Sequence, residues 1–348
     1  MKESTDGLLR VLIYVDDILV SGPKALIAWL KDNLEVSFKI KSTKDVEKYV
    51  GLDITRKQNH IELGHQSKIL DTVKSWELNE AKPRQYPITP SDTDDIEEER
   101  MPDLKKYQSI VGSLGYISRG SRPDIAYAVN YLARRTQEAS SRLLKIAKNV
   151  LVYVRDTIEQ RIVLYRNNRK ENTITMYVDA SFASEKKRQS VYGFLIYLND
   201  NLICYRSKKL PMIVLSSTEA EYVGICKAVQ ELMWIKNIMT EMNMKVHNTL
   251  ILSDSQPAIK MIGSPVLNGR TKHVDLKLQY IRERYIQGEF EIEYIESKEN
   301  LADLLTKVLR GQQFDYLKTK IFERHFYEMR EGVDKRVKRD IKLINDTV

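Results

Sequence analysis

Two acidic residues in the C-terminal half follow apolar runs that could form buried strands. Asp179 comes directly after Ile174–Val178, and Asp254 closely follows Leu250–Leu252. Burying a lone carboxylate costs several kcal/mol unless a cation or hydrogen bonds compensate it. Each acid alone is also typical of a cap or a turn, so the chemistry depends on whether several of them meet.

Two further acids are expected near the starts of helices. Glu221 opens a long helical pattern and Asp303 lies early in the last one. Acids at strand ends and at the starts of helices packed on those strands can converge, where they repel one another and some pKa values rise. Magnesium relieves this repulsion because it prefers hard oxygen ligands and keeps waters for a phosphate substrate. Two such ions about 4 Å apart can bind the attacking water and the leaving oxygen of a phosphodiester.

A second acidic pair, Asp16 and Asp17, interrupts an almost wholly apolar stretch from Leu8 to Val20. This pattern predicts two buried strands joined by a tight turn that carries both acids. An Asp-Asp turn is ordinary by itself. The apolar runs on both sides make Tyr14–Asp17 a more specific pattern than an ordinary Asp-Asp turn.

The four C-terminal acids must be positioned by a series of strands and helices. The pattern predicts the order β-β-β-α-β-α-α-β-α, which implies an α/β or α+β layer fold around a mixed sheet with flanking helices. The strands are expected at Ile174–Phe182, Val191–Leu198, Leu202–Arg206, Thr249–Asp254 and Phe290–Ile295. The helices are expected at Ser217–Met242, from Pro257, at His273–Gln287 and at Asn300–Leu309.

The N-terminal half divides at an acidic stretch flanked by prolines, which is typical of a solvated linker. Before it we expect a helix at Lys24–Leu34 and strands at Tyr49–Thr55 and His60–Leu63; after it, Leu104 to Asp156 is helical in pattern. The predicted division is 1–90, the acidic linker 91–103, a helical connection 104–171, the mixed sheet 172–310 and a charged tail 311–348. We expect 172–310 to fold without 1–90, since few contacts should cross such a linker.

The composition favours a chain with packed cores and a basic surface. The net charge is +8, and arginines and lysines recur between Arg119 and Lys148. This surplus suits a polyanionic partner or an ordinary basic protein equally well. The two cysteines, Cys204 and Cys226, exclude a disulfide framework and fit a reducing compartment. No signal peptide or membrane span is expected.

Several segments together resemble the Pol polyprotein of copia-type LTR retrotransposons. YVDAS, SSTEAEYVGICKAV, LSDSQPAI, RTKHVD and ENLADLLTK resemble its RNase H domain in family order, over residues 172–310. YQSIVGSLGYISRGSRPDIAYAVNYLAR resembles the segment that joins polymerase to RNase H, and IYVDDILVSG resembles the reverse transcriptase turn with two adjacent aspartates. Almost the whole chain is thereby accounted for, as a partial reverse transcriptase palm and thumb, a connection and an RNase H domain.

The resemblance implies an endonuclease that cuts the RNA strand of RNA–DNA hybrids with two Mg²⁺ ions, or with Mn²⁺. Its partners would be the hybrid, the nucleic-acid backbone held by basic residues of 104–148, and other Pol or Gag products. The implied location is a cytoplasmic virus-like particle or the nucleus. The implied metal ligands are Asp179, Glu221, Asp254 and Asp303 for RNase H, and Asp16 and Asp17 for the polymerase remnant.

Two assignments within the resemblance need comment. Helix geometry does not choose between Glu219 and Glu221, which both flank the apolar stripe; the RNase H register, with Ala228-Val229 after the glutamate, favours Glu221. Many RNases H carry a histidine before the last acidic helix, but here the loop at 296–299 has none. His273 belongs to a copia-type motif, and we interpret it as an ordinary residue at a helix start.

The polymerase remnant is expected to be inactive. Only Glu3 and Asp6 are acidic among the residues before Tyr14, so a third catalytic aspartate and the fingers are lacking in this chain. Two alternatives to an active nuclease stay open. The chain could be an inactive nucleic-acid-binding relic of a decayed element, or it could work only beside a full-length polymerase.

Overall fold

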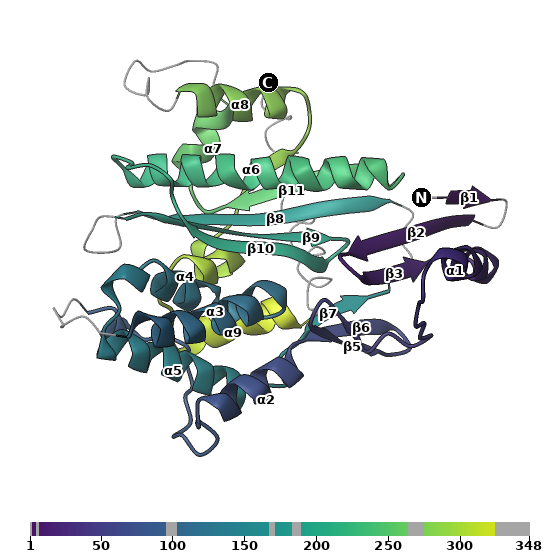
Figure 1. The fold of residues 1–348 in the computed structure, drawn as a ribbon. Coiled ribbons are helices and arrows are strands. Elements are labelled where there is room, and N and C mark those ends of the chain that lie inside the picture. Colours follow the sequence, from purple (N-terminus) through teal and green to yellow (C-terminus); the bar gives the residue numbers. More distant parts are fainter. Residues whose placement is uncertain are drawn as a thin grey trace.

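A computed structural model describes residues 2–4, 7–94, 103–166, 171–182, 189–263 and 275–323. Its centre is a five-stranded sheet with the strand order β10-β9-β8-β11-β12 (Figure 1). β8 (Asn172–Ser181), β9 (Val191–Leu198) and β10 (Asn201–Lys209) pair antiparallel. β11 (Val246–Ser253) runs parallel to β8 and to β12 (Glu291–Tyr294). The predicted mixed sheet is confirmed, and its parallel centre brings the C-terminal ends of β8 and β11 to one edge.

One face of this sheet is covered by helices that follow its third strand. α6 (Ser217–Glu241) lies along the face, with α7 (Gln256–Gly263) and α8 (Asp275–Ile286) beside it (Figure 1). Val178, Phe194 and Ile196 point into this core and are at most 1% exposed. Because β8 is buried on both faces, its residues read as a nearly continuous apolar run.

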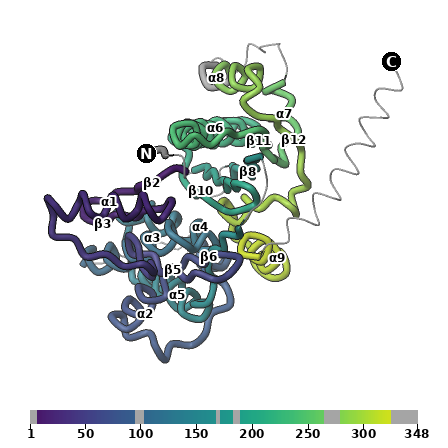
Figure 2. The backbone as a smooth tube through the Cα atoms, turned by 90° about the vertical axis from the view of Figure 1, so that its right-hand side faces the viewer, coloured from purple at the N-terminus to yellow at the C-terminus, as the bar shows by residue number. Residues whose placement is uncertain are grey.

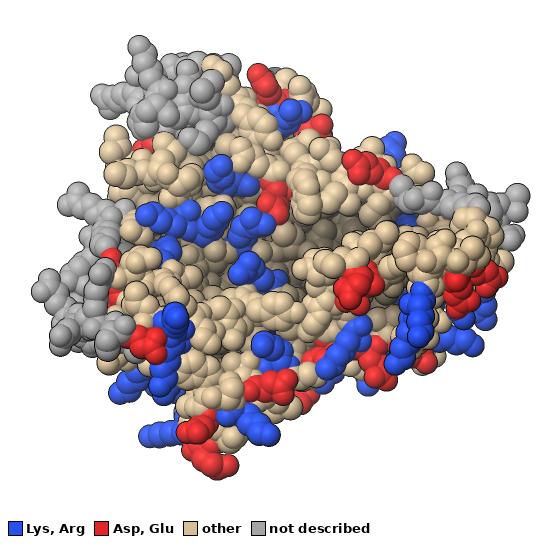
Figure 3. Space-filling model, viewed as in Figure 1, with Lys and Arg blue, Asp and Glu red and all other residues tan. Residues whose placement is uncertain are grey.

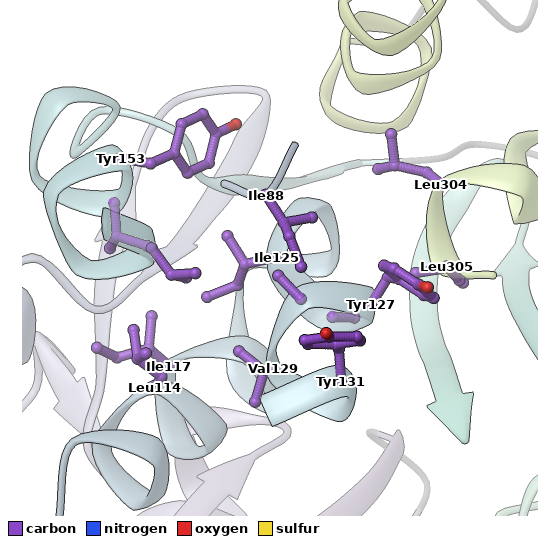
Figure 4. Packing of buried hydrophobic residues seen from close by; sticks show 14 of the residues in the cluster. Ile88, Leu114, Ile117, Ile125, Tyr127, Val129, Tyr131, Tyr153, Leu304 and Leu305 are labelled. Carbon is purple, nitrogen blue, oxygen red and sulfur yellow. The ribbon is translucent and has the colours of Figure 1, made fainter. Parts of the chain in front are cut away.

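The other face packs against the predicted connection. It consists of α3 (Leu104–Gly120), α4 (Ala126–Ala133) and α5 (Ser141–Asp156), joined by α9 (Gly311–Phe322). Tyr177, Leu195 and Tyr197 of the sheet share one apolar cluster with these helices. Figure 4 shows Tyr127 of α4 beside Leu305. The five-part division stays a prediction, but this shared core argues against independent folding of 172–310.

A second sheet ties the N-terminal part to the connection. Its order is β4 (Lys48–Tyr49), β5 (Leu52–Arg56), β6 (His60–Gly64) and β7 (Ile162–Tyr165), all antiparallel. α2 (Gln66–Ser75) packs on α5. Residues 95–102 of the predicted linker lie outside the described part of the chain. The pairing of β6 with β7 therefore joins segments from both sides of that linker.

The N-terminal hairpin forms as predicted, but its predicted burial is wrong. β2 (Gly7–Tyr14) pairs with β3 (Asp17–Ser21), and β1 (Lys2–Ser4) and α1 (Lys24–Ser37) lie beside them. Leu12, Ile13 and Tyr14 are 56%, 65% and 56% exposed. Figure 2 shows the hairpin and α1 at one side of the body. These side chains are exposed because no other described element covers this part of the hairpin.

The last predicted helix, Asn300–Leu309, is also corrected. The chain instead forms short 3₁₀ turns at Ser297–Glu299 (η5) and Leu301–Leu305 (η6), and α9 follows after a break. The i+3 bond from the Thr306 amide to the Asp303 carbonyl closes the tighter turn at 3.2 Å. The predicted charged tail begins with the helix α9, which ends at Phe322, and residues 324–348 lie outside the described part. None of the described helices is long and apolar enough to cross a membrane.

Candidate active site

Three of the four predicted acids meet at one edge of the central sheet. Asp179 lies near the end of β8, Asp254 directly follows β11, and Asp303 lies in η6. One carboxylate oxygen from each can be chosen so that all three lie within 4.8 Å of one another. The parallel pairing of β8 with β11 brings the first two together, and η6 carries the third against β8 and β9.

Glu221 lies beside this group, in the second turn of α6. It is 9% exposed, and its Oε2 accepts a hydrogen bond of 3.1 Å from the Ala180 amide, next to Asp179. Glu219 instead accepts a bond from the Leu215 amide at 2.7 Å, outside the cluster. The structure thus places Glu221, the predicted residue, beside Asp179, and it places Glu219 at the helix start.

Burial and mutual repulsion raise the pKa values of these acids. Burial and the charges of Asp179 and Asp254 raise the pKa of Glu221 to about 10. Burial and the charge of Asp179 raise the pKa of Asp303 to about 7, against an opposing effect of Lys307. Burial raises the pKa of Asp179 as well. The cluster therefore holds protons in the neutral pH range unless a cation replaces them.

Lys307, which the sequence analysis did not single out, extends into the cluster. Its Nζ lies 3.3 Å from Asp179 Oδ1 and 2.8 Å from Asp303 Oδ1. The two carboxylates hold the pKa of this ammonium above its usual value, against the effect of burial. The available signal was its position four residues after Asp303 within the ENLADLLTK segment.

Two further polar residues orient Asp254. Ser297 Oγ donates a bond of 2.6 Å to Asp254 Oδ2, and Asn300 Nδ2 lies 3.3 Å from Oδ1. Asn300 is fully buried and also donates to the Val178 carbonyl at 3.0 Å. The loop in which we noted no histidine thus supplies a serine to the cluster. His273 lies outside the described residues.

This donor set suits a hard divalent cation. Three carboxylates supply only oxygen atoms, which is the ligand chemistry of Mg²⁺ and Mn²⁺. Hydrogen bonds from neighbouring side chains to the carboxylates that bind a metal, such as those from Ser297 and Asn300 to Asp254, are typical of metal sites. One ammonium, that of Lys307, compensates only part of the charge of four acids. The residues present therefore fit a metal.

The polymerase pair lies elsewhere. Asp16 and Asp17 are exposed at the tip of the β2–β3 hairpin, where Tyr14 pairs with Asp17. Val15 has a φ of 54°, which is a strained conformation for a β-branched residue. In the described residues, neither aspartate belongs to a group of three potential metal ligands. The structure does not bring this pair to the four C-terminal acids.

The predicted basic surface of 104–148 is only partly available. Arg122 is buried and forms a two-bond ion pair with Asp124 at 2.9 and 2.7 Å, so it cannot hold a duplex. Figure 3 shows basic side chains gathered between α6 and the connection helices, over the region of β10. β10 carries Arg206, Lys208 and Lys209. In the register of the sheet, Ser207 of β10 is paired with Gly193 of β9, which is in turn paired with Asp179 of β8. Arg206 and Lys208 pair with Phe194 and Tyr192, so they lie on the α6 face of the sheet, opposite to Asp179. Arg206 also forms an ion pair of 2.9 Å with Glu231.

The chain matches known families over most of its length. Residues 1–90 match a family model described as reverse transcriptase (RNA-dependent DNA polymerase). The retrovirus-related Pol polyprotein from transposon RE1 of Arabidopsis thaliana is 31% identical over 90% of this chain, but this chain spans only 22% of that polyprotein. The putative transposon Ty5-1 protein of Saccharomyces cerevisiae is 32% identical over 66% of this chain and 76% of its own length.

Two solved structures align with parts of this chain. The foamy viral protease–reverse transcriptase, solved with double-stranded DNA, aligns over 82% of this chain and 55% of its own, with a TM-score of 0.43 and 13% identity. LC11-RNase H1, solved with an RNA/DNA hybrid, aligns over 38% of this chain and 93% of its own, with a TM-score of 0.31 and 16% identity.

Proposed function

The chain belongs to the Pol polyproteins of copia-type retrotransposons, and we propose from this premise that its C-terminal half is a metal-dependent ribonuclease H. The proposed substrate is the RNA strand of an RNA–DNA hybrid. The observation that carries the proposal is the meeting of Asp179, Asp254 and Asp303 within 4.8 Å at one sheet edge. Acids concentrated in this way, with raised pKa values, are typical of a functional site.

The residues of the chain have distinct roles in this proposal. Asp179, Glu221, Asp254 and Asp303 would hold two Mg²⁺ ions, or Mn²⁺. When bound, the ions supply positive charge to the phosphodiester and activate water for hydrolysis. Ser297 and Asn300 orient the Asp254 carboxylate, so it needs to move less when a metal binds. Lys307 balances negative charge in the metal-free protein and is itself 35% exposed, so its ammonium can move aside.

The basic residues of β10 suit contacts with a nucleic-acid backbone. Arg206, Lys208 and Lys209 lie on the same strand, and the last two lie toward the end of the sheet that carries Asp179. Lysine and arginine contacts to phosphates supply sequence-independent affinity that falls with salt. We propose that these residues replace the connection arginines as the main backbone contacts. Other Pol or Gag products are proposed partners, in a cytoplasmic particle or the nucleus.

The test is cleavage of a labelled RNA–DNA hybrid by the purified full chain. We expect Mg²⁺-dependent cuts in the RNA strand, which disappear with EDTA and in Asp303→Asn. The matched control is Asp315→Asn, because Asp315 lies on the surface of α9 and is 47% exposed. Cleavage that survives Asp303→Asn would contradict the proposal.

The alternative is a nucleic-acid-binding relic without turnover. It requires salt-sensitive binding of the hybrid with no metal-dependent cleavage by wild-type protein. Asp16 and Asp17 are exposed and, among the described residues, belong to no group of three potential metal ligands, which favours loss of the polymerase reaction. It says nothing against the acid cluster, whose acids and orienting residues are all present.

A further inference from the structure

We propose that Thr306 is a positioning residue that fixes the orientation of the Asp179 carboxylate and thereby sets the metal affinity of the cluster. This inference rests on the proposed function. Thr306 is fully buried, and its Oγ1 donates a hydrogen bond to Asp179 Oδ2. It is not an acid, so the search for metal ligands in the sequence passed over it.

Each of the two oxygens of Asp179 has one hydrogen-bond partner among the residues that the structure describes. Lys307 Nζ lies 3.3 Å from Oδ1, and Thr306 holds Oδ2. Asp179 is 1% exposed, so solvent does not supply other partners. A carboxylate oxygen can accept more than one bond. Because each oxygen uses one lone pair for its hydrogen bond, its other lone pair is available to a cation between Asp179 and the neighbouring acids Asp254 and Asp303.

The single proton of the Thr306 hydroxyl has three acceptors within reach. The Ala302 carbonyl lies at 3.4 Å and the Asp303 carbonyl at 3.3 Å, both longer than the contact with Asp179. A charged acceptor forms the stronger bond. A buried hydroxyl near the end of a turn would otherwise bond to a carbonyl of that turn. The proton therefore goes to the carboxylate.

Close packing on the sheet holds Thr306 in place. A Cβ at Gly193 would lie 2.5 Å from Leu305 Cβ and 3.0 Å from Thr306 Cγ2. Gly193 is the partner of Asp179 in the β8–β9 pairing. The backbone of 305–306 can thus lie directly on β9 only because residue 193 has no side chain. The methyl group of Thr306 fills this contact, and its hydroxyl faces Asp179.

Loss of the hydroxyl should loosen Asp179 without removing a ligand. Its remaining side-chain partner among the described residues would be Lys307, which is 35% exposed and is shared with Asp303. Outer-shell partners of metal ligands typically contribute 10–100-fold to metal affinity or activity. Thr306→Val keeps the volume and the methyl contact but removes the hydroxyl. Thr306→Ser keeps the hydroxyl and removes only the methyl, which makes it the matched control.

The experiment compares wild type, Thr306→Val and Thr306→Ser in the full chain. For each protein, the melting temperature is followed as MgCl₂ is titrated, and hybrid cleavage is measured at the same concentrations. We expect Thr306→Val to need roughly 10–100-fold more Mg²⁺ for half of the maximal thermal shift and half-maximal cleavage. Thr306→Ser should stay within about 3-fold of wild type, well below that outer-shell effect.

A double-mutant cycle separates this inference from the proposed function. Unfolding in urea with EDTA is measured for Thr306→Val, for Asp179→Ala, which leaves Thr306 without this acceptor, and for the double variant. We expect the two changes to be non-additive, because they remove the same hydrogen bond. Additive effects, or equal Mg²⁺ affinities of Thr306→Val and wild type, would overturn the positioning role of Thr306. They would leave the proposed metal site intact. Non-additive effects with no Mg²⁺ response in wild type would overturn the metal site and leave only a structural contact.

Discussion

Removing the connection should destabilise the RNase H sheet, because the connection covers one of its faces. We consider a fragment of residues 172–323, which keeps all five strands of the central sheet, α6–α8, η6 and α9. Its sheet side chains that belong to the shared cluster are each at most 6% exposed in the full chain: Tyr177, Val191, Leu195, Tyr197 and Leu202.

The magnitude follows from the burial of these side chains. Full burial of a large apolar side chain stabilises by about 1.5–3 kcal/mol, so the five contribute on the order of 10 kcal/mol. η6 and α9 remain in the fragment and cover part of the face. Even half of the loss, on the order of 5 kcal/mol, compares with the whole stability of a typical domain, about 5–15 kcal/mol.

The assay compares this fragment with residues 7–323 by near- and far-ultraviolet circular dichroism and by urea unfolding. We expect the fragment to keep secondary structure, to lose near-ultraviolet signal, and to unfold without a cooperative transition, as expanded states do. The longer chain should unfold cooperatively. A fragment that unfolds cooperatively at a similar urea midpoint would refute the reasoning and restore our initial expectation that 172–310 folds by itself.

Three further predictions concern the two acidic sites. Glu221→Gln should lower hybrid cleavage by more than the 10–100-fold typical of outer-shell residues, whereas Glu219→Gln should leave most of it; the reverse result would show the register to be wrong. In EDTA, stability should fall as pH rises from about 5 to 8, since Glu221 and Asp303 keep protons in the folded state that the unfolded chain has lost. The free energy of unfolding should fall by about 1.4 kcal/mol per pH unit for each such proton. Urea midpoints that rise with pH would contradict this prediction. The chain should not extend a primed template in Mg²⁺ or Mn²⁺, and extension that Asp16→Asn abolishes would contradict this.

The sequence was sufficient to predict most of the strands and helices of the C-terminal half and the acids that meet there. Apolar runs ending in Asp179 and Asp254 predicted two strands, and the structure contains them as β8 and β11. The order of elements predicted a mixed sheet with flanking helices, because period-2 and period-3.6 patterns are local properties. The choice of Glu221 came from the motif register, and the structure places that residue beside Asp179.

Tertiary structure decided what local patterns do not encode. The apolar pattern of β2 predicted burial, but burial depends on whether another element packs there, and Ile13 is 65% exposed. The sequence around Asp303 reads as a helix, yet η6 is a 3₁₀ turn pressed against Gly193. The contacts of Thr306 and Lys307 with Asp179 followed only from this packing. Which residue types can hold a metal is written in the sequence, whereas the contacts that orient them arise from elements distant in the chain.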